Sequence, residues 1–241
     1  MQEINSFKKG LKDGIPICIG YFSVAFAFGI FAVENGLTVW QAVAISLTNL
    51  TSAGQLAGVP IITGGGTFAE LALSQLVINS RYSLMSVSLS QKFSKNVKLW
   101  DKLLIAYGNT DEIFDVAHSN KGEIGKKYMW GLILLPVLGW TSGTLAGAVA
   151  GNILPAIVIS ALGLAIYGMF TAIVVPVAKK EKATALCVFL AIALSCAFRY
   201  IPALNVVPSG FTVIICAVVA SAIFAIVAPI NTEESEENKN E

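Results

Sequence analysis

The residues best able to do chemistry in this chain are polar side chains set among apolar neighbours. They are Asn49, Ser52, Gly54 and Gln55 in a first group, Glu70 after the glycine turn 64–66, and Gln75, Asn79 and Arg81 beyond it. Hydrocarbon offers such groups no water, so each one needs a protein partner or a wet cavity. The stretch from Asn49 to Arg81 is therefore predicted to hold a binding site or a pathway, with the rest of the chain as its scaffold.

The elements that must position these residues are membrane helices. The chain has 241 residues, of which 55% are hydrophobic and only 13% are charged, whereas an average soluble domain has about 25% charged residues. The composition predicts an all-α polytopic integral membrane protein with about six or seven transmembrane helices, since several apolar runs reach the ~18 residues of a spanning helix. The formal net charge of +1 argues against a nucleic-acid partner.

The predicted organisation is a single membrane transport domain over residues 1–230. Its apolar segments are about 14–33, 39–60, 68–90, 128–151, 155–178, 183–197 and 210–227. A lysine-rich, cytoplasmic-type loop over 91–127 is expected outside the bilayer, and Thr110-Asp111-Glu112 indicates an amphipathic helix there, lying on the membrane surface. The acidic tail over 231–241 has no apolar residue and is predicted to be disordered.

Segment 39–60 allows two interpretations, because its middle is polar. It is either one helix with a polar face, or a helix broken near residues 51–54, as two half-helices or a re-entrant hairpin. If every segment crosses once from a cytoplasmic N-terminus, the lysines of loop 91–127 and of the cluster 179–182 fall outside, against the positive-inside tendency. An external N-terminus instead leaves Lys8, Lys9 and Lys12 outside. The charge pattern favours the broken or re-entrant interpretation, and a broken helix suits a zwitterionic ligand.

Two charged residues in segment 68–90 need partners from elsewhere. Glu70 and Arg81 are eleven residues apart, which is about 16 Å along a helix at 1.5 Å per residue. They cannot pair with each other in an unbroken helix. Glu70 is either an interfacial residue beside the glycine turn or a candidate for ion coupling, whereas the deeper Arg81 is expected to support the site.

Four glycines recur every four residues in segment 128–151, namely Gly139, Gly143, Gly147 and Gly151. Such a stripe marks close contact between membrane helices, either within the chain or with another subunit. The cysteines lie singly in apolar segments and the one histidine, His118, lies in the loop. This spacing argues against a disulfide or a zinc site, and no metal or cofactor is expected.

Taken together, three motifs resemble those of the AzlC-type branched-chain amino acid permease family. They are Gly54-Gln55 within Ser52-Ala-Gly-Gln-Leu, Asn79-Ser-Arg81, and Thr110-Asp111-Glu112, and the resemblance extends from about Lys9 to Val227. It implies export of valine, leucine, isoleucine and analogues such as azaleucine across the bacterial cytoplasmic membrane, together with a small AzlD-type membrane subunit. The family is expected to have a histidine after the arginine. This chain has Tyr82 there, which puts a proton-carrying role for that position in doubt.

Three classes of function remain to be compared, namely a secondary exporter, a membrane-embedded enzyme and a non-transporting assembly subunit. A secondary exporter fits best, because the sequence has no P-loop for ATP hydrolysis and one loop histidine argues against a metalloenzyme. The alternatives are a non-transporting membrane assembly subunit and a transporter of other small hydrophobic solutes. For an amino acid, the N–H groups near Ser52–Gln55, supported by Arg81, are expected to meet the carboxylate. The ammonium would meet oxygens of Asn49, Gln55 or Asn79, and Phe22 and Phe26 would bound the apolar side chain.

Overall fold

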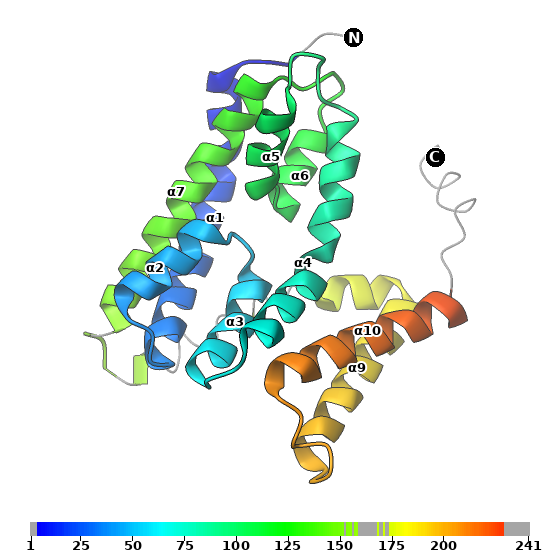
Figure 1. Cartoon of the computed structure of the whole chain (residues 1–241). Coiled ribbons are helices and arrows are strands. Elements are labelled where there is room, and N and C mark those ends of the chain that lie inside the picture. The colour runs from blue at the N-terminus through cyan, green and yellow to red at the C-terminus, as the bar shows by residue number, and fades with distance from the viewer. Residues whose placement is uncertain are drawn as a thin grey trace. The chain divides into compact units, whose positions relative to one another are not determined.

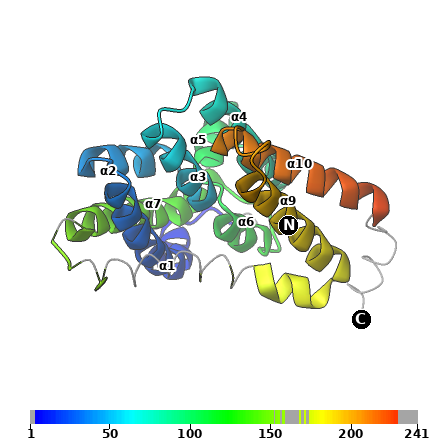
Figure 2. The same ribbon diagram turned by 90° about the horizontal axis from the view of Figure 1, so that it is seen from below.

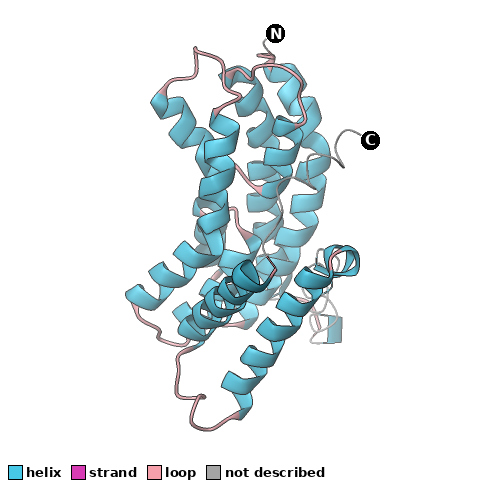
Figure 3. Ribbon diagram, turned by 90° about the vertical axis from the view of Figure 1, so that its right-hand side faces the viewer, coloured by secondary structure: helices cyan, strands magenta, loops and turns pink. Residues whose placement is uncertain are grey.

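The fold is helical throughout the part of the chain that the structure describes. A computed structural model describes residues 4–151, 153–155, 157–158, 168, 171 and 174–228. In that part there is no β-sheet, and Ile124 forms isolated bridges to Ile4 and Phe93 (Figure 3). The chain divides into two compact units, residues 1–168 and 169–241. The single transport domain expected over residues 1–230 stays a prediction.

The first unit contains the polar stretch and its scaffold (Figure 1). Its helices are α1 (Phe7–Glu34), α2 (Val39–Thr48), α3 (Ser52–Thr63), α4 (Phe68–Ser90), α5 (Leu99–Tyr107), α6 (Asp111–His118) and α7 (Lys126–Gly151). Side-chain caps fix several helix starts. Ser6, Thr38 and Thr67 each accept a hydrogen bond from a backbone N–H in the first turn of α1, α2 and α4.

Helices α1 and α7 form the centre of this unit and lie side by side along their whole length (Figures 1 and 2). They run in the same direction, because Gly131 faces Phe7, Gly139 faces Cys18 and Gly151 faces Ile30. A methyl group built on Gly139 would lie 2.5 Å from the Cys18 carbonyl oxygen, so only glycine permits this approach. The intrachain alternative for the glycine stripe is confirmed, and the proposed contact with another subunit is wrong because α1 occupies that face.

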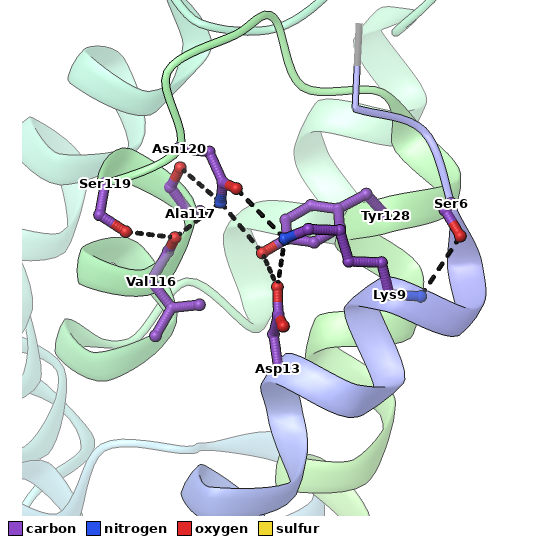
Figure 4. A network of polar contacts seen from close by, with 8 residues as sticks. All are labelled: Ser6, Lys9, Asp13, Val116, Ala117, Ser119, Asn120 and Tyr128. Atoms are coloured by element: carbon purple, nitrogen blue, oxygen red, sulfur yellow. Dashed lines mark hydrogen bonds and ion pairs between the residues drawn. The ribbon is translucent and has the colours of Figure 1, made fainter.

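A polar network, which we call the clamp, ties the starts of α1 and α7 to the end of α6 (Figure 4). The Tyr128 hydroxyl donates to Asp13 Oδ2 at 2.9 Å and accepts from Asn120 Nδ2 at 3.1 Å. The Lys9 ammonium lies 2.7 Å from Asp13 Oδ2 and donates to Asn120 Oδ1 at 3.4 Å. The N-terminal lysines and Lys127 therefore lie at the same end of the unit.

The expectation that the helix after Thr110 lays its apolar face on the membrane surface is wrong, whereas the extramembrane position of loop 91–127 stays a prediction. Thr110 does begin α6, but Ile113 and Ala117 on that helix are fully buried. Helix α6 packs against α1, α4 and α7. Its apolar face was expected to meet the membrane surface, and it instead completes the core around α1 and α7.

Four of the described helices are long and apolar enough to cross a membrane, namely α1, α7, α9 (Lys182–Tyr200) and α10 (Ser209–Val227). Helix α4 has 23 residues, but its polar side chains keep it out of this set. The predicted segment 155–178 lies mostly outside the described residues, as does the tail 231–241. A total of six or seven crossings stays a prediction.

The second unit is described by a helical stretch at 174–180 and by α9 and α10, which pack against each other. These two helices match the predicted segments 183–197 and 210–227 closely. In α9 no residue is buried within the described structure.

Candidate functional site

Segment 39–60 is broken, and the break is built by Asn49. Helix α2 ends at Thr48 and α3 begins at Ser52, while the backbone of Asn49 is extended, with φ −141° and ψ 114°. Asn49 Oδ1 accepts a hydrogen bond of 3.0 Å from the Thr51 N–H. An asparagine side chain that bonds the backbone two residues ahead offers the chain an alternative to the helix. Of the two interpretations, the structure therefore has the broken one, and a re-entrant course stays a prediction.

Gln75 of α4 closes one side of the break. Its Nε2 donates to the Gly54 carbonyl at 2.9 Å, and its Oε1 accepts from Asn49 Nδ2 at 3.4 Å and from Asn79 Nδ2 at 3.1 Å. A methyl group on Gly54 would lie 2.5 Å from Gln75 Oε1, so glycine makes room for this amide. Because the Gly54 carbonyl can only accept, it fixes the orientation of Gln75, and Gln75 in turn fixes that of Asn79.

Gln55 of α3 closes the other side. Its Nε2 donates to the Asn49 carbonyl at 2.7 Å and to Ser46 Oγ at 3.1 Å. Ser46 Oγ lies 2.7 Å from Thr144 Oγ1 of α7, and the Thr144 hydroxyl donates to the Trp140 carbonyl. Both hydrogens on Gln55 Nε2 are thus used, and the amide is fixed by a backbone acceptor.

Three oxygen atoms remain without a hydrogen-bond partner in this break cluster, which we define as Ser46, Asn49, Thr51, Gly54, Gln55, Gln75, Asn79 and Thr144. They are Thr51 Oγ1, Gln55 Oε1 and Asn79 Oδ1, and all three are buried. Gln55 is only 1% exposed. A buried polar group without a partner costs about 1–3 kcal/mol. The Gln55 amide has used both of its N–H donors, and the three oxygens have no donor, so the cluster is a candidate site for a ligand that brings N–H groups, such as an ammonium.

The predicted site residues fall into two groups. Asn49, Gly54, Gln55 and Asn79 come together in the break cluster, and Ser52 is the first residue of α3 beside it. Other predicted residues lie elsewhere. Phe22 and Phe26 are on α1, where their backbone packs against Gly143 and Gly147, and Phe22 is 42% exposed. Glu70 is in the first turn of α4 with its side chain buried within the chain, and its interfacial and ion-coupling roles both stay predictions.

Arg81 is also outside the cluster, because its partner is Asp111 at the start of α6. Arg81 Nη1 lies 2.8 Å from Asp111 Oδ2, and Arg81 Nη2 donates to the Tyr82 hydroxyl at 3.0 Å. Burial raises the pKa of the Asp111 carboxyl above its ordinary value, although Arg81 acts in the opposite direction. Both side chains are about half exposed, so the pair is worth about 0–1 kcal/mol. Its main effect is to join α4 to α6.

Tyr21 makes a similar connection from α1. Its hydroxyl lies 2.5 Å from both Thr110 Oγ1 and Glu112 Oε2, and its ring meets Trp140 edge-on with centroids 5.2 Å apart. The Thr110-Asp111-Glu112 motif is therefore a docking point for α1 and α4. Among the described residues, no group of three or more His, Cys, Asp or Glu side chains could hold a metal ion.

Sequence reasoning placed Gln75 in the polar stretch without giving it a contact to substrate, and it missed Ser46, Thr51 and Thr144 as members of the cluster. Gln75 carried a signal, since a glutamine inside an apolar helix needs a partner. Ser46, Thr51 and Thr144 carried none, because single hydroxyl residues in membrane helices usually bond their own backbone, as Thr48 does to the Ala44 carbonyl.

Comparison with known proteins relates this chain to one family of membrane proteins. The profile of the family described as AzlC protein matches residues 16–154. The chain is 29% identical over 195 residues to the inner membrane protein YgaZ of Escherichia coli, covering 78% of each protein. It is 31% identical over 172 residues to an uncharacterized membrane protein of Archaeoglobus fulgidus, covering 70% of this chain and 75% of that one. No solved structure matches the chain.

Proposed function

Because this chain belongs to the AzlC family, we propose that it is the transport subunit of a branched-chain amino acid exporter in the bacterial cytoplasmic membrane. It would move valine, leucine, isoleucine and analogues such as azaleucine, together with a small AzlD-type membrane subunit. The observation that carries the proposal is the break cluster, where three buried oxygens have no donor. Transport would be driven by a gradient or by downhill flow, since the sequence has no P-loop.

The substrate would bind at the break with its ammonium toward Thr51, Gln55 and Asn79. An ammonium carries three N–H donors, and the cluster has three oxygens to receive them. The carboxylate would meet the first turn of α3, whose N–H groups have no intrahelical acceptor and no side-chain cap. Arg81 is engaged with Asp111, so it would act on the position of α6 rather than on the carboxylate.

The parallel arrangement of α1 and α7 supports a course in which α2 and α3 do not cross the membrane as a pair. If α1 and α7 each cross in the same direction, the chain between them must return once. Helix α4 supplies that return, so α2 and α3 would enter and leave by the same side. The N-terminal lysines and Lys127 then share the cytoplasmic side, as the positive-inside tendency requires. A cysteine at Lys121 should resist an impermeant maleimide in intact cells, and one at Asn35 should react.

Efflux of radiolabelled leucine and valine from preloaded proteoliposomes tests the function directly. We expect efflux only when this chain is present, and stronger efflux when a small membrane subunit is co-reconstituted. Competition by azaleucine and by other amino acids defines the substrate class. Efflux of other hydrophobic solutes without leucine efflux would favour the alternative substrate class, and no efflux of any solute would favour an assembly subunit.

A further inference from the structure

A second gap in hydrogen bonding lies where α5 meets α6. Gly108, Asn109 and Thr110 join these helices, and all three are buried. Asn109 is 2% exposed. Its Nδ2 donates to Ser86 Oγ of α4 at 3.0 Å, whereas its Oδ1 has no partner. This is the same deficit as in the break cluster, where an amide oxygen is buried without a donor.

Asn109 is one of the residues that line a cavity between α4 and α5. The cavity has a volume of about 200 Å³ and is lined by ten residues, most of them apolar, including Val87, Leu89 and Ile105. The partly exposed Lys102 also lines it. Drug-sized ligands occupy sites of about 300–1,000 Å³, so this cavity fits a smaller molecule. Its lining suits a compact apolar group, with one hydrogen-bond donor for Asn109 and a negative charge near Lys102.

The junction of α5 and α6 touches the break in segment 39–60. The Tyr107 hydroxyl donates a hydrogen bond to the Leu47 carbonyl, and Leu47 precedes Asn49 by two residues. Tyr107 also lies directly between Ala106, which lines the cavity, and the Gly108–Thr110 junction. The Tyr107–Leu47 contact therefore joins α5, which lines the cavity, to α2, which ends at the break.

We infer that the cavity between α4 and α5 is a second substrate station, which loads the break cluster with small zwitterions that carry a compact apolar side chain. The apolar side chain lies against Val87, Leu89 and Ile105, and the ammonium meets Asn109 Oδ1 once the substrate displaces the neighbouring side chains that cover this buried atom. Lys102 attracts the carboxylate as the substrate arrives. The inference rests on the proposed function, because it assigns the same substrate class to another place in the chain.

The sharpest test fills the cavity from its exposed side. Leu103 lines the cavity and is 53% exposed, whereas its neighbour Leu104 is 55% exposed and does not line it. Leu103→Trp should block the cavity, and Leu104→Trp is the matched control at almost equal exposure. Asn109→Ala removes the unpaired oxygen itself, with membrane abundance measured for each variant because Asn109 is buried.

Equilibrium dialysis of the purified full chain with radiolabelled leucine should give two bound equivalents for the wild type and Leu104→Trp. Leu103→Trp should bind one, and its efflux should fall about ten- to a hundredfold, the value of one hydrogen bond to a charged group. One equivalent in the wild type, or identical behaviour of the two tryptophan variants, overturns the second station and leaves the break cluster in place. No bound leucine and no efflux in the wild type would overturn the proposed function, and the inference with it.

Discussion

The clamp and the break cluster are both polar networks inside one apolar unit, and they differ in how completely their hydrogen bonds are made. In the clamp, Lys9, Asp13, Asn120 and Tyr128 satisfy one another. None of their atoms is among the buried side-chain atoms without a partner in the described structure. The break cluster leaves three oxygens unpaired. A saturated network holds helices together, whereas an unsaturated one inside a membrane protein is a candidate ligand site.

The largest expected effect is that of Gln55→Met, which removes a free acceptor together with two donated hydrogen bonds. Leucine efflux should fall by more than about a hundredfold, since one charge-assisted bond alone is worth about ten- to a hundredfold. The measurement is efflux from proteoliposomes containing equal amounts of protein. Gln41→Met makes the same chemical change in the exposed capping box of α2 and should keep most of the activity. Wild-type efflux by Gln55→Met would place the site elsewhere.

Thr51→Val tests whether an unpaired oxygen of the break cluster serves the ligand rather than the fold. It should lower leucine affinity without lowering the stability of the protein. Thr51 Oγ1 is buried without a partner and does not cap α3, so valine removes an unpaired group at no cost in hydrogen bonds. Thermal unfolding temperature should stay equal or rise, while apparent leucine affinity falls about ten- to a hundredfold.

Thr141→Val is the matched control for Thr51→Val, since Thr141 Oγ1 on α7 is also buried without a partner. It should show the same direction of stability change with unchanged leucine affinity. Equal affinities for both variants and the wild type would mean that the unpaired hydroxyl at the break does not contact substrate.

Tyr128→Phe should lower the stability of the protein without changing its leucine affinity, because it removes two hydrogen bonds of the clamp. Asp13 loses a donor and Asn120 loses an acceptor, so the free energy of unfolding should fall by about 1–3 kcal/mol. Leucine affinity should not change. Thermal unfolding and leucine binding are measured on the same preparation, with the exposed Tyr200→Phe as a control. A drop in affinity without a drop in stability would make the clamp part of the site.

Lys9→Gln should have the smallest effect. Its ion pair with Asp13 is 45% exposed on the lysine side, and exposed pairs contribute about 0–1 kcal/mol. The loss in unfolding free energy should therefore be smaller than that of Tyr128→Phe, and it should shrink further in high salt. A larger loss than in Tyr128→Phe would assign the clamp's stability to charge rather than to its hydroxyl bonds.

Much of the helical framework could be predicted from apolar length alone. The segments 128–151, 183–197 and 210–227 match α7, α9 and α10 within a few residues, because a long apolar run has few other stable states in a membrane. The break was also predictable. Polar residues in the middle of an apolar segment indicated it near residues 51–54, and the structure places it slightly earlier, between Thr48 and Ser52.

The partners of individual residues could not be predicted in the same way. The spacing of Glu70 and Arg81 excluded a pair between them, but helical spacing carries no information about which other helix faces each residue. The Asp111 partner of Arg81 comes from α6, a helix that the sequence placed on the membrane surface. Eight residues such as those of α6 are too few for periodicity to distinguish a surface helix from one that packs into the core.

The unpaired oxygens of the break cluster were even harder to predict from the sequence than these partners. Gln55 and Asn79 were predicted as candidates because amides in apolar segments are rare. Which atom of each amide is free depends on the backbone carbonyls of Asn49 and Gly54, and their positions follow only from the three-dimensional break.

The four glycines of the stripe on α7 also restrict how this protein can move. They recur every four residues, or about 6 Å along the axis at 1.5 Å per residue, and α1 is seated in them. A shear of α1 along α7 by less than one repeat would drive a large side chain that flanks the stripe, such as Trp140, into α1. We therefore expect α1 and α7 to move together as one rigid body. If the chain transports as proposed, alternating access in this unit would come from the short helices on either side of the Tyr107–Leu47 contact, and amide hydrogen exchange should be slow in α1 and α7 and fast in those short helices.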